Sequence, residues 1–222
     1  MGETVHLTAI DGKTISAYRA EPSGTPKGAL VVLQEIFGVN GHMRSVCDGF
    51  ARAGYMALAP ALYDRVEPGI ELGYDGPDVE TGRTVRAQTD LADVLKDVQA
   101  AIDAAADAGP VGVIGYCWGG SLAFLSATRL TGLAAAVGYY GGQIVPFVTE
   151  MPKVPIILHF GEKDHGIPMS DVETIRQRHP DTSIFVYPAG HGFNCDERGG
   201  YDKPSAELAL DRTLKFFAEK LR

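Results

Sequence analysis

Short apolar runs alternate with amphipathic segments along most of this chain. The apolar runs, each bounded by turn-forming residues, predict strands over residues 29–33, 55–59, 111–115, 134–140, 155–160 and 183–187. Helices are predicted between them, over residues 43–53, 88–106, 121–129 and 171–178, and from residue 205 to the end. This alternation predicts an α/β fold with a mostly parallel central sheet and helices on both faces.

Two segments do not follow this alternation. Residues 4–9 and 14–19 are short β-prone runs on either side of Asp11-Gly12, a strong hairpin-turn dipeptide. Residues 60–82 are rich in Gly, Pro and Asp and show no periodicity, so we predict a long loop there. A loop of this length inside a compact domain is usually functional and often covers a site.

Size and composition favour a single α/β domain over residues 1–222, because 45% hydrophobic residues can fill a full core. The net charge is 20 − 28 = −8 with neutral histidines, and Lys and Arg form no run, so nucleic acid and anionic membranes are unfavourable partners. The three widely spaced cysteines favour reduced thiols over a disulfide framework. With no recognisable secretory signal or membrane-spanning run, we expect a cytoplasmic monomer.

The most informative segment is Gly115-Tyr116-Cys117-Trp118-Gly119-Gly120, which joins a predicted strand to a predicted helix. A strand, a sharp Gly-x-nucleophile-x-Gly turn and a helix form the nucleophile elbow of α/β-hydrolases, here with cysteine in the usual place of serine. Neighbouring side chains would collide with the strand and helix, which explains the glycines. The alternative is a small buried cysteine with no chemical role.

A cysteine nucleophile needs a base, and the base needs an acid that orients it. In α/β-hydrolases the chain order is nucleophile, acid, histidine, each after a strand. Asp164 follows the strand predicted at 155–160, and His191 follows the one at 183–187. Asp164 could instead cap a helix, His165 is a neighbouring candidate base, and His191 could be a loop histidine without a task. All three positions match in order, which favours a catalytic triad.

Metal and cofactor sites have no support in the sequence. Neither an HExxH nor a CxxC motif occurs, and no two histidines stand at helical i, i+4 spacing. The glycine-rich segment at 138–142 contains neither a Walker lysine nor a dinucleotide fingerprint. We therefore expect no metal and no cofactor.

The chain resembles the dienelactone hydrolase (carboxymethylenebutenolidase) family, small α/β-hydrolases with a Cys-Asp-His triad. The resemblance rests on Gln-Glu-Ile-Phe-Gly at 34–38, on residues 115–120, on Val-Gly-Tyr-Tyr-Gly at 137–141 and on Gly-His-Gly-Phe at 190–193. It implies that Glu35 is the family's buried glutamate, which contacts the resting thiol and helps to generate the thiolate. It also implies an oxyanion hole formed by the backbone N–H groups of Ile36 and Trp118, consistent with one donor just after the nucleophile and one after an early strand.

The substrate is less well defined than the catalytic groups. Family enzymes hold the dienelactone carboxylate with two arginines, one of which lies four residues after the catalytic histidine, where this chain has Cys195. Arg83 and Arg86 are candidates for the other, although exposed arginines are ordinarily solvated. Tyr139 matches an aromatic residue that faces the family's pocket. The resemblance implies a cysteine hydrolase of a small-molecule lactone or ester, with a general carboxylesterase and a non-catalytic or redox-sensing thiol protein as alternatives.

Overall fold

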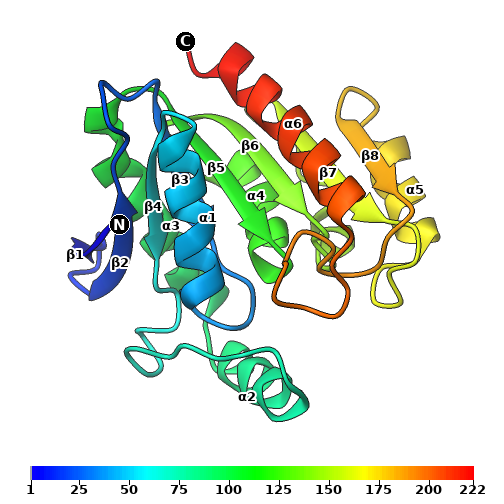
Figure 1. Cartoon of the computed structure of the whole chain (residues 1–222), viewed down its shortest axis with the longest axis horizontal. Coiled ribbons are helices and arrows are strands. Elements are labelled where there is room, and N and C mark those ends of the chain that lie inside the picture. Colours follow the sequence, from blue (N-terminus) through cyan, green and yellow to red (C-terminus); the bar gives the residue numbers. More distant parts are fainter. Residues whose placement is uncertain (1) are drawn as a thin grey trace.

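The computed structural model describes residues 2–222, which form one sheet of eight strands with helices on both faces (Figure 1). The strands are β1 (Glu3–Thr8), β2 (Thr14–Ala20), β3 (Ala29–Leu33), β4 (Met56–Pro60), β5 (Val111–Tyr116), β6 (Leu133–Tyr139), β7 (Ile156–Gly161) and β8 (Ser183–Tyr187). The helices are α1 (Gly41–Arg52), α2 (Gly76–Ala87), α3 (Leu91–Ala105), α4 (Trp118–Arg129), α5 (Met169–Arg178) and α6 (Lys203–Lys220), with short 3-10 turns η1 (Ala106–Ala108) and η2 (Val145–Phe147). The predicted α/β fold is confirmed.

The sheet has the order β1-β2-β4-β3-β5-β6-β7-β8. Strands β3 to β8 pair in parallel, whereas β2 runs antiparallel to both β1 and β4. Helices α1 and α6 cover one face and α3, α4 and α5 cover the other, so β3 and β5 are buried along their whole length (Figure 1). The carboxyl ends of the parallel strands meet at one edge of the sheet, the place where ligands and catalytic groups collect in such folds.

The segment 60–82 is not wholly a loop, because helix α2 begins inside it at Gly76. The Asp75 side chain accepts a hydrogen bond from the Asp78 N–H and caps the helix. Only Gly82 and Val85 of α2 are buried, so the helix has too few apolar positions to produce a periodic pattern. The helix predicted over 88–106 begins instead at Leu91, after the Asp90 cap, and α6 begins two residues before 205.

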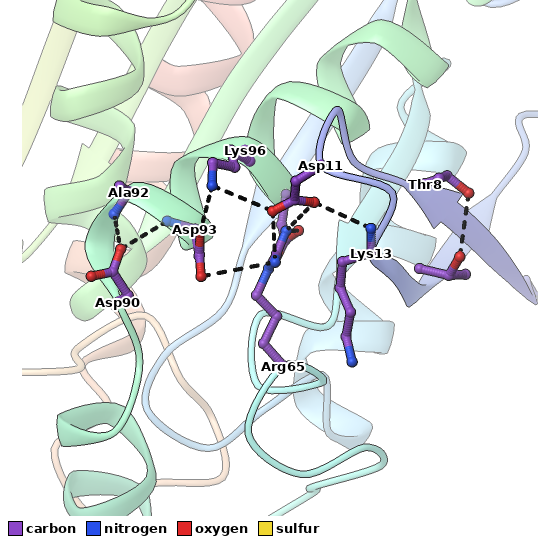
Figure 2. A network of polar contacts seen from close by, with 10 residues as sticks. Thr8, Asp11, Lys13, Arg65, Asp90, Ala92, Asp93 and Lys96 are labelled. Carbon is purple, nitrogen blue, oxygen red and sulfur yellow. Dashed lines mark hydrogen bonds and ion pairs between the residues drawn. The ribbon is translucent and has the colours of Figure 1, made fainter.

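The amino-terminal hairpin is tied to the rest of the sheet by a charged network (Figure 2). Arg65 makes two hydrogen bonds of 2.8 Å to Asp97 and two, of 2.9 and 3.1 Å, to Asp11 in the hairpin turn. Lys96 joins Asp11 to Asp93 on helix α3. Asp97 is fully buried, and burial raises the pKa of its carboxyl, against the opposing effect of Arg65. Arg65 therefore neutralises a charge that the core could not otherwise hold.

Helix α4 is buried from Trp118 to Thr128, almost all the way round. It packs against β5 and β6, and the buried Ser126 hydroxyl donates to the Leu122 carbonyl oxygen at 2.7 Å. Although α4 is so apolar, it is short. Within residues 2–222 none of the helices combines the length and the apolar character that crossing a bilayer requires.

Candidate active site

Cys117 lies at the turn between β5 and α4, at the carboxyl edge of the sheet. Its φ of 55° and ψ of −114° are unusual for a residue with a side chain, and mark a strained backbone. The Gly119 N–H donates to the Gln34 carbonyl oxygen at 3.1 Å, and a Cβ on Gly119 would collide with the carbonyl oxygens of Leu33 and Gln34. The glycine thus permits the close approach that holds the sulfur above the sheet.

The structure brings Cys117, His191 and Asp164 together in one chain of contacts. His191 Nε2 lies 3.1 Å from the Cys117 sulfur, and His191 Nδ1 lies 2.6 Å from Asp164 Oδ2. The other Asp164 oxygen accepts the Gly166 N–H at 2.8 Å. Helix α5 begins at Met169 with Pro168 at its cap, so Asp164 does not cap it. The neighbouring His165 is exposed.

The charge on His191 is set by its two partners. Burial alone would lower the pKa of the imidazolium, but the hydrogen bonds to Asp164 and Cys117 outweigh burial and raise the pKa to about 10. The carboxyl of Asp164 is inaccessible to solvent, whereas the ring of His191 is 30% exposed. A protonated imidazole held between a carboxylate and a sulfur can donate a proton at neutral pH.

The backbone N–H groups of Ile36 and Trp118 donate no hydrogen bond to another residue of the described chain. Trp118 is the first residue of α4, where helix N–H groups have no partner inside the helix. Ile36 lies in the loop between β3 and α1. Both amides remain available to an external acceptor, as an oxyanion hole requires.

Glu35 is 1% exposed and is paired with Arg198, whose Nη1 lies 3.0 Å from Glu35 Oε1. The second carboxylate oxygen, Oε2, is buried and has no hydrogen-bond partner among residues 2–222. Burial opposes the charge on Arg198, but attraction to Glu35 and neighbouring groups outweighs it and raises the pKa of the guanidinium. Within the described chain no hydrogen bond joins Glu35 to Cys117. The Cys117 sulfur contacts His191 Nε2 instead.

The sequence assigns no role to Arg198, which lies further along than the family arginine position that Cys195 occupies. It lies seven positions after His191 in the loop between β8 and α6, and its guanidinium also stacks over the rings of Phe37 and Tyr74 at 5.4 and 5.8 Å. The only available signal was an arginine near the catalytic histidine, and its spacing differs from that of the family arginine. Its contact with Glu35 depends on how the loop folds.

Of the two candidate arginines, Arg83 is solvent-exposed and pairs with Glu80 at 2.9 Å. Arg86 lines a cavity of about 370 Å³ that Trp118 and Gln143 also line. Trp118 itself is 7% exposed and stacks on Tyr63, with ring centroids 5.5 Å apart. Arg86, unlike Arg83, therefore lies at a cavity that borders the elbow.

Tyr139 does not face the catalytic groups, contrary to the expectation from its family match. Its buried hydroxyl lies 2.7 Å from the Thr213 hydroxyl of α6, on the other side of the sheet end. Tyr140 takes the expected place, with its ring centroid 5.1 Å from that of His191. Tyr140 has a φ of 38°, and this turn at the end of β6 directs its ring to the triad.

No group of three or more His, Cys, Asp or Glu residues in the described part of the chain is arranged to hold a metal ion.

Comparisons with known proteins find relatives over nearly the whole chain. The dienelactone hydrolase family matches residues 15–221. A Synechocystis sp. protein assigned as a carboxymethylenebutenolidase is 38% identical over 94% of this chain and 93% of its own length. The carboxymethylenebutenolidase of Pseudomonas putida is 34% identical over 97% of this chain and 96% of its own. The crystal structure of a Klebsiella pneumoniae protein assigned as a dienelactone hydrolase superposes with a TM-score of 0.86 and 32% identity, covering 99% of both chains.

Proposed function

Because this chain belongs to the dienelactone hydrolase family, we propose that it hydrolyses small lactones or esters through an acyl-enzyme on Cys117. The observation that carries this proposal is the contact chain from sulfur to imidazole to carboxylate, with distances of 3.1 and 2.6 Å. In this scheme Cys117 is the nucleophile, His191 moves protons and Asp164 orients the imidazole.

In the acylation step, the Cys117 thiolate attacks the acyl carbon and a carbon–sulfur bond forms. The carbonyl electron pair moves to oxygen, and the N–H groups of Ile36 and Trp118 stabilise that oxyanion. When the intermediate collapses, the acyl carbon–oxygen bond breaks and the alkoxide or enolate leaves. In a lactone this leaving oxygen stays attached through the opened ring. The raised pKa of His191 supports a role as the source of the proton that this oxygen takes up.

In the deacylation step, water attacks the thioester carbonyl while His191 accepts a proton from it. The second tetrahedral intermediate then expels the Cys117 thiolate and releases the carboxylic acid. A thiolate is a better leaving group than an unprotonated amine, so a tetrahedral intermediate formed from an amide returns to substrate more readily than one formed from an activated ester. Activated lactones and esters therefore fit this site better than peptides.

Glu35 and Arg198 form the second part of the proposed machinery. A substrate carboxylate that pairs with Arg198 would compete with Glu35 for the guanidinium. Glu35, once displaced, would be a buried carboxylate in need of a proton or a new donor, and the family resemblance implies that the Cys117 thiol supplies that proton. In this way an anionic substrate would promote formation of the thiolate.

The substrate class follows from the two cationic side chains near the elbow. Arg86 on its cavity wall and Arg198 beside Glu35 favour an anionic lactone such as dienelactone. The alternative, a carboxylesterase for neutral small esters, applies if neither arginine binds substrate. Replacing Arg86 with Gln should raise KM for dienelactone and leave KM for 4-nitrophenyl acetate unchanged. Arg83→Gln on the exposed side of the same helix is the matched control.

Cys117→Ala tests the catalytic assignment itself. We expect kcat/KM for dienelactone or 4-nitrophenyl acetate to fall by about a thousandfold or more, because the nucleophile is lost. Cys47→Ala and Cys195→Ala should retain activity, since both thiols are buried and outside the contact chain. Retained hydrolysis in Cys117→Ala would contradict the proposed function.

A further inference from the structure

A second cavity, of about 340 Å³, opens between helices α1 and α6. Both helices lie on the same face of the sheet, and the loop that leads into α6 runs between their ends (Figure 1). The cavity walls include the aliphatic and aromatic side chains of Val46, Phe50, Tyr116, Leu210 and Leu214, and none of the triad residues. We call it the α1–α6 pocket. Its volume is within the range of known small-molecule sites.

One polar side chain on this wall is nearly fully buried. His42 is 5% exposed, and its Nδ1 lies 3.2 Å from Asp196 Oδ1. Because a carboxylate can only accept, this contact places the hydrogen on Nδ1. In the neutral form of the ring Nε2 is a hydrogen-bond acceptor, and Nε2 has no protein partner among residues 2–222. The Nε2 atom is not among the inaccessible unpaired polar atoms of residues 2–222, so it retains some access to solvent, and His42 is one of the residues that line the pocket.

These features define the chemistry of a ligand. An unpaired acceptor on the wall of a partly apolar cavity favours a ligand with a hydroxyl donor, and the rings of Phe50 and Tyr116 favour a flat apolar body. Two carboxylates, Asp196 and Glu207, stand on the pocket wall against one arginine, Arg52, which disfavours an anionic ligand. We propose that the α1–α6 pocket is a second binding site, and that it takes a small neutral phenol whose hydroxyl donates to His42 Nε2.

The pocket is connected to the catalytic centre through one segment of chain. Asn194 and Asp196 line the pocket and lie between His191 and Arg198. A phenol that holds His42 against Asp196 therefore contacts the segment that positions the imidazole. The effect on hydrolysis rests on the proposed function: aryl esters release phenols, so the occupant of this pocket is of the same class as a product of the reaction.

Binding is tested by isothermal titration calorimetry of the full chain with p-cresol and with its methyl ether, 4-methylanisole. The ether has the same ring but no donor, so it should bind roughly five- to tenfold more weakly, which is the value of one hydrogen bond. His42→Phe should weaken p-cresol by a similar factor and leave the ether unchanged. Leu214→Trp, which fills the pocket, should remove binding of both, while the control Leu208→Ala on the exposed side of α6 should not.

Equal affinity for p-cresol and its ether, or full affinity in His42→Phe, would overturn the proposal, as would the absence of any binding. Thermal melting of each variant identifies one that fails to fold, in which case the cresol and ether comparison in the wild type still decides. Where p-cresol changes the rate of 4-nitrophenyl acetate hydrolysis, this change should saturate at the p-cresol concentrations at which calorimetry shows binding. The change should disappear in Leu214→Trp. Calorimetry does not depend on turnover, so failure of this site and failure of the catalytic assignment are distinguishable.

Discussion

Two consecutive tyrosines at the end of β6 provide a matched pair for a stability experiment. Tyr139 and Tyr140 are both about fully buried, at 1% and 0% exposed. The Tyr139 hydroxyl is hydrogen-bonded to Thr213 at 2.7 Å, whereas the Tyr140 hydroxyl has no partner among residues 2–222. Replacing each tyrosine with phenylalanine removes one oxygen and leaves the ring and the backbone requirement unchanged. The two variants should therefore change stability in opposite directions.

The magnitudes follow from the cost of a buried hydroxyl. An unpaired buried hydroxyl destabilises a protein by roughly 1–3 kcal/mol, so Tyr140→Phe should raise the free energy of unfolding by about 1 kcal/mol. Tyr139→Phe loses a hydrogen bond and should lower it by about 1 kcal/mol, since Thr213 keeps its contact with His159 Nε2 at 3.2 Å. For a chain of this size each change corresponds to a shift in Tm of roughly 2–4 °C.

Urea unfolding, followed by circular dichroism, measures both variants against the wild type. The slope of the free energy with urea should be the same in all three, since neither substitution changes the surface exposed on unfolding. If Tyr140→Phe is destabilised as much as Tyr139→Phe, the Tyr140 hydroxyl has a hydrogen-bond partner in solution. The reasoning from burial would then be refuted.

Three further predictions concern the packing of the elbow and two buried ionisable groups. Gly119→Ala should lower the free energy of unfolding by about 3 kcal/mol or more because its Cβ meets backbone oxygens. The control Gly49→Ala in α1, whose Cβ would only make an ordinary 3.7 Å contact with Arg52 Nη2, should be neutral or stabilising in the same unfolding experiments. Arg65→Met should lower the free energy of unfolding by roughly 3 kcal/mol at pH 7, because it leaves the Asp97 carboxylate buried and unpaired. This loss of stability should shrink as the pH falls and Asp97 is protonated. A loss that does not change with pH in urea titrations would contradict the assignment. Burial and the nearby Arg212 lower the pKa of His159 to about 3. Below about pH 6.5 the unfolded chain therefore binds a proton that the folded chain does not, and the free energy of unfolding should fall towards pH 3 by up to about 1.4 kcal/mol per pH unit. In His159→Gln, acid titrations should show the loss of this component of the slope.

Most of the sheet could be predicted because each parallel strand carries its own signal. A strand buried on both faces is a continuous apolar run, as at Ala29–Leu33, and needs no distant partner to be recognised. The same holds for Cys117 and Asp164, which each follow such a strand, while His191 follows the partly buried strand β8, and the three come in a known order. Helix α2 lacks this local signal: it is held at its start by the Asp75 cap and buries only two residues.

The exchange of Tyr139 for Tyr140 shows where local reasoning ends. Successive side chains of a strand point to opposite faces, so one of these two residues had to face away from His191. Which one does depends on where β6 stops pairing, because Tyr140 leaves the strand with a φ of 38° and its N–H donates to the His159 carbonyl oxygen at 2.7 Å. That hydrogen bond comes from another strand, as the Arg198 contact with Glu35 comes from another loop. The spacing of residues along the sequence cannot predict the positions of side chains that depend on such long-range contacts. Here these side chains include the ones that surround the triad.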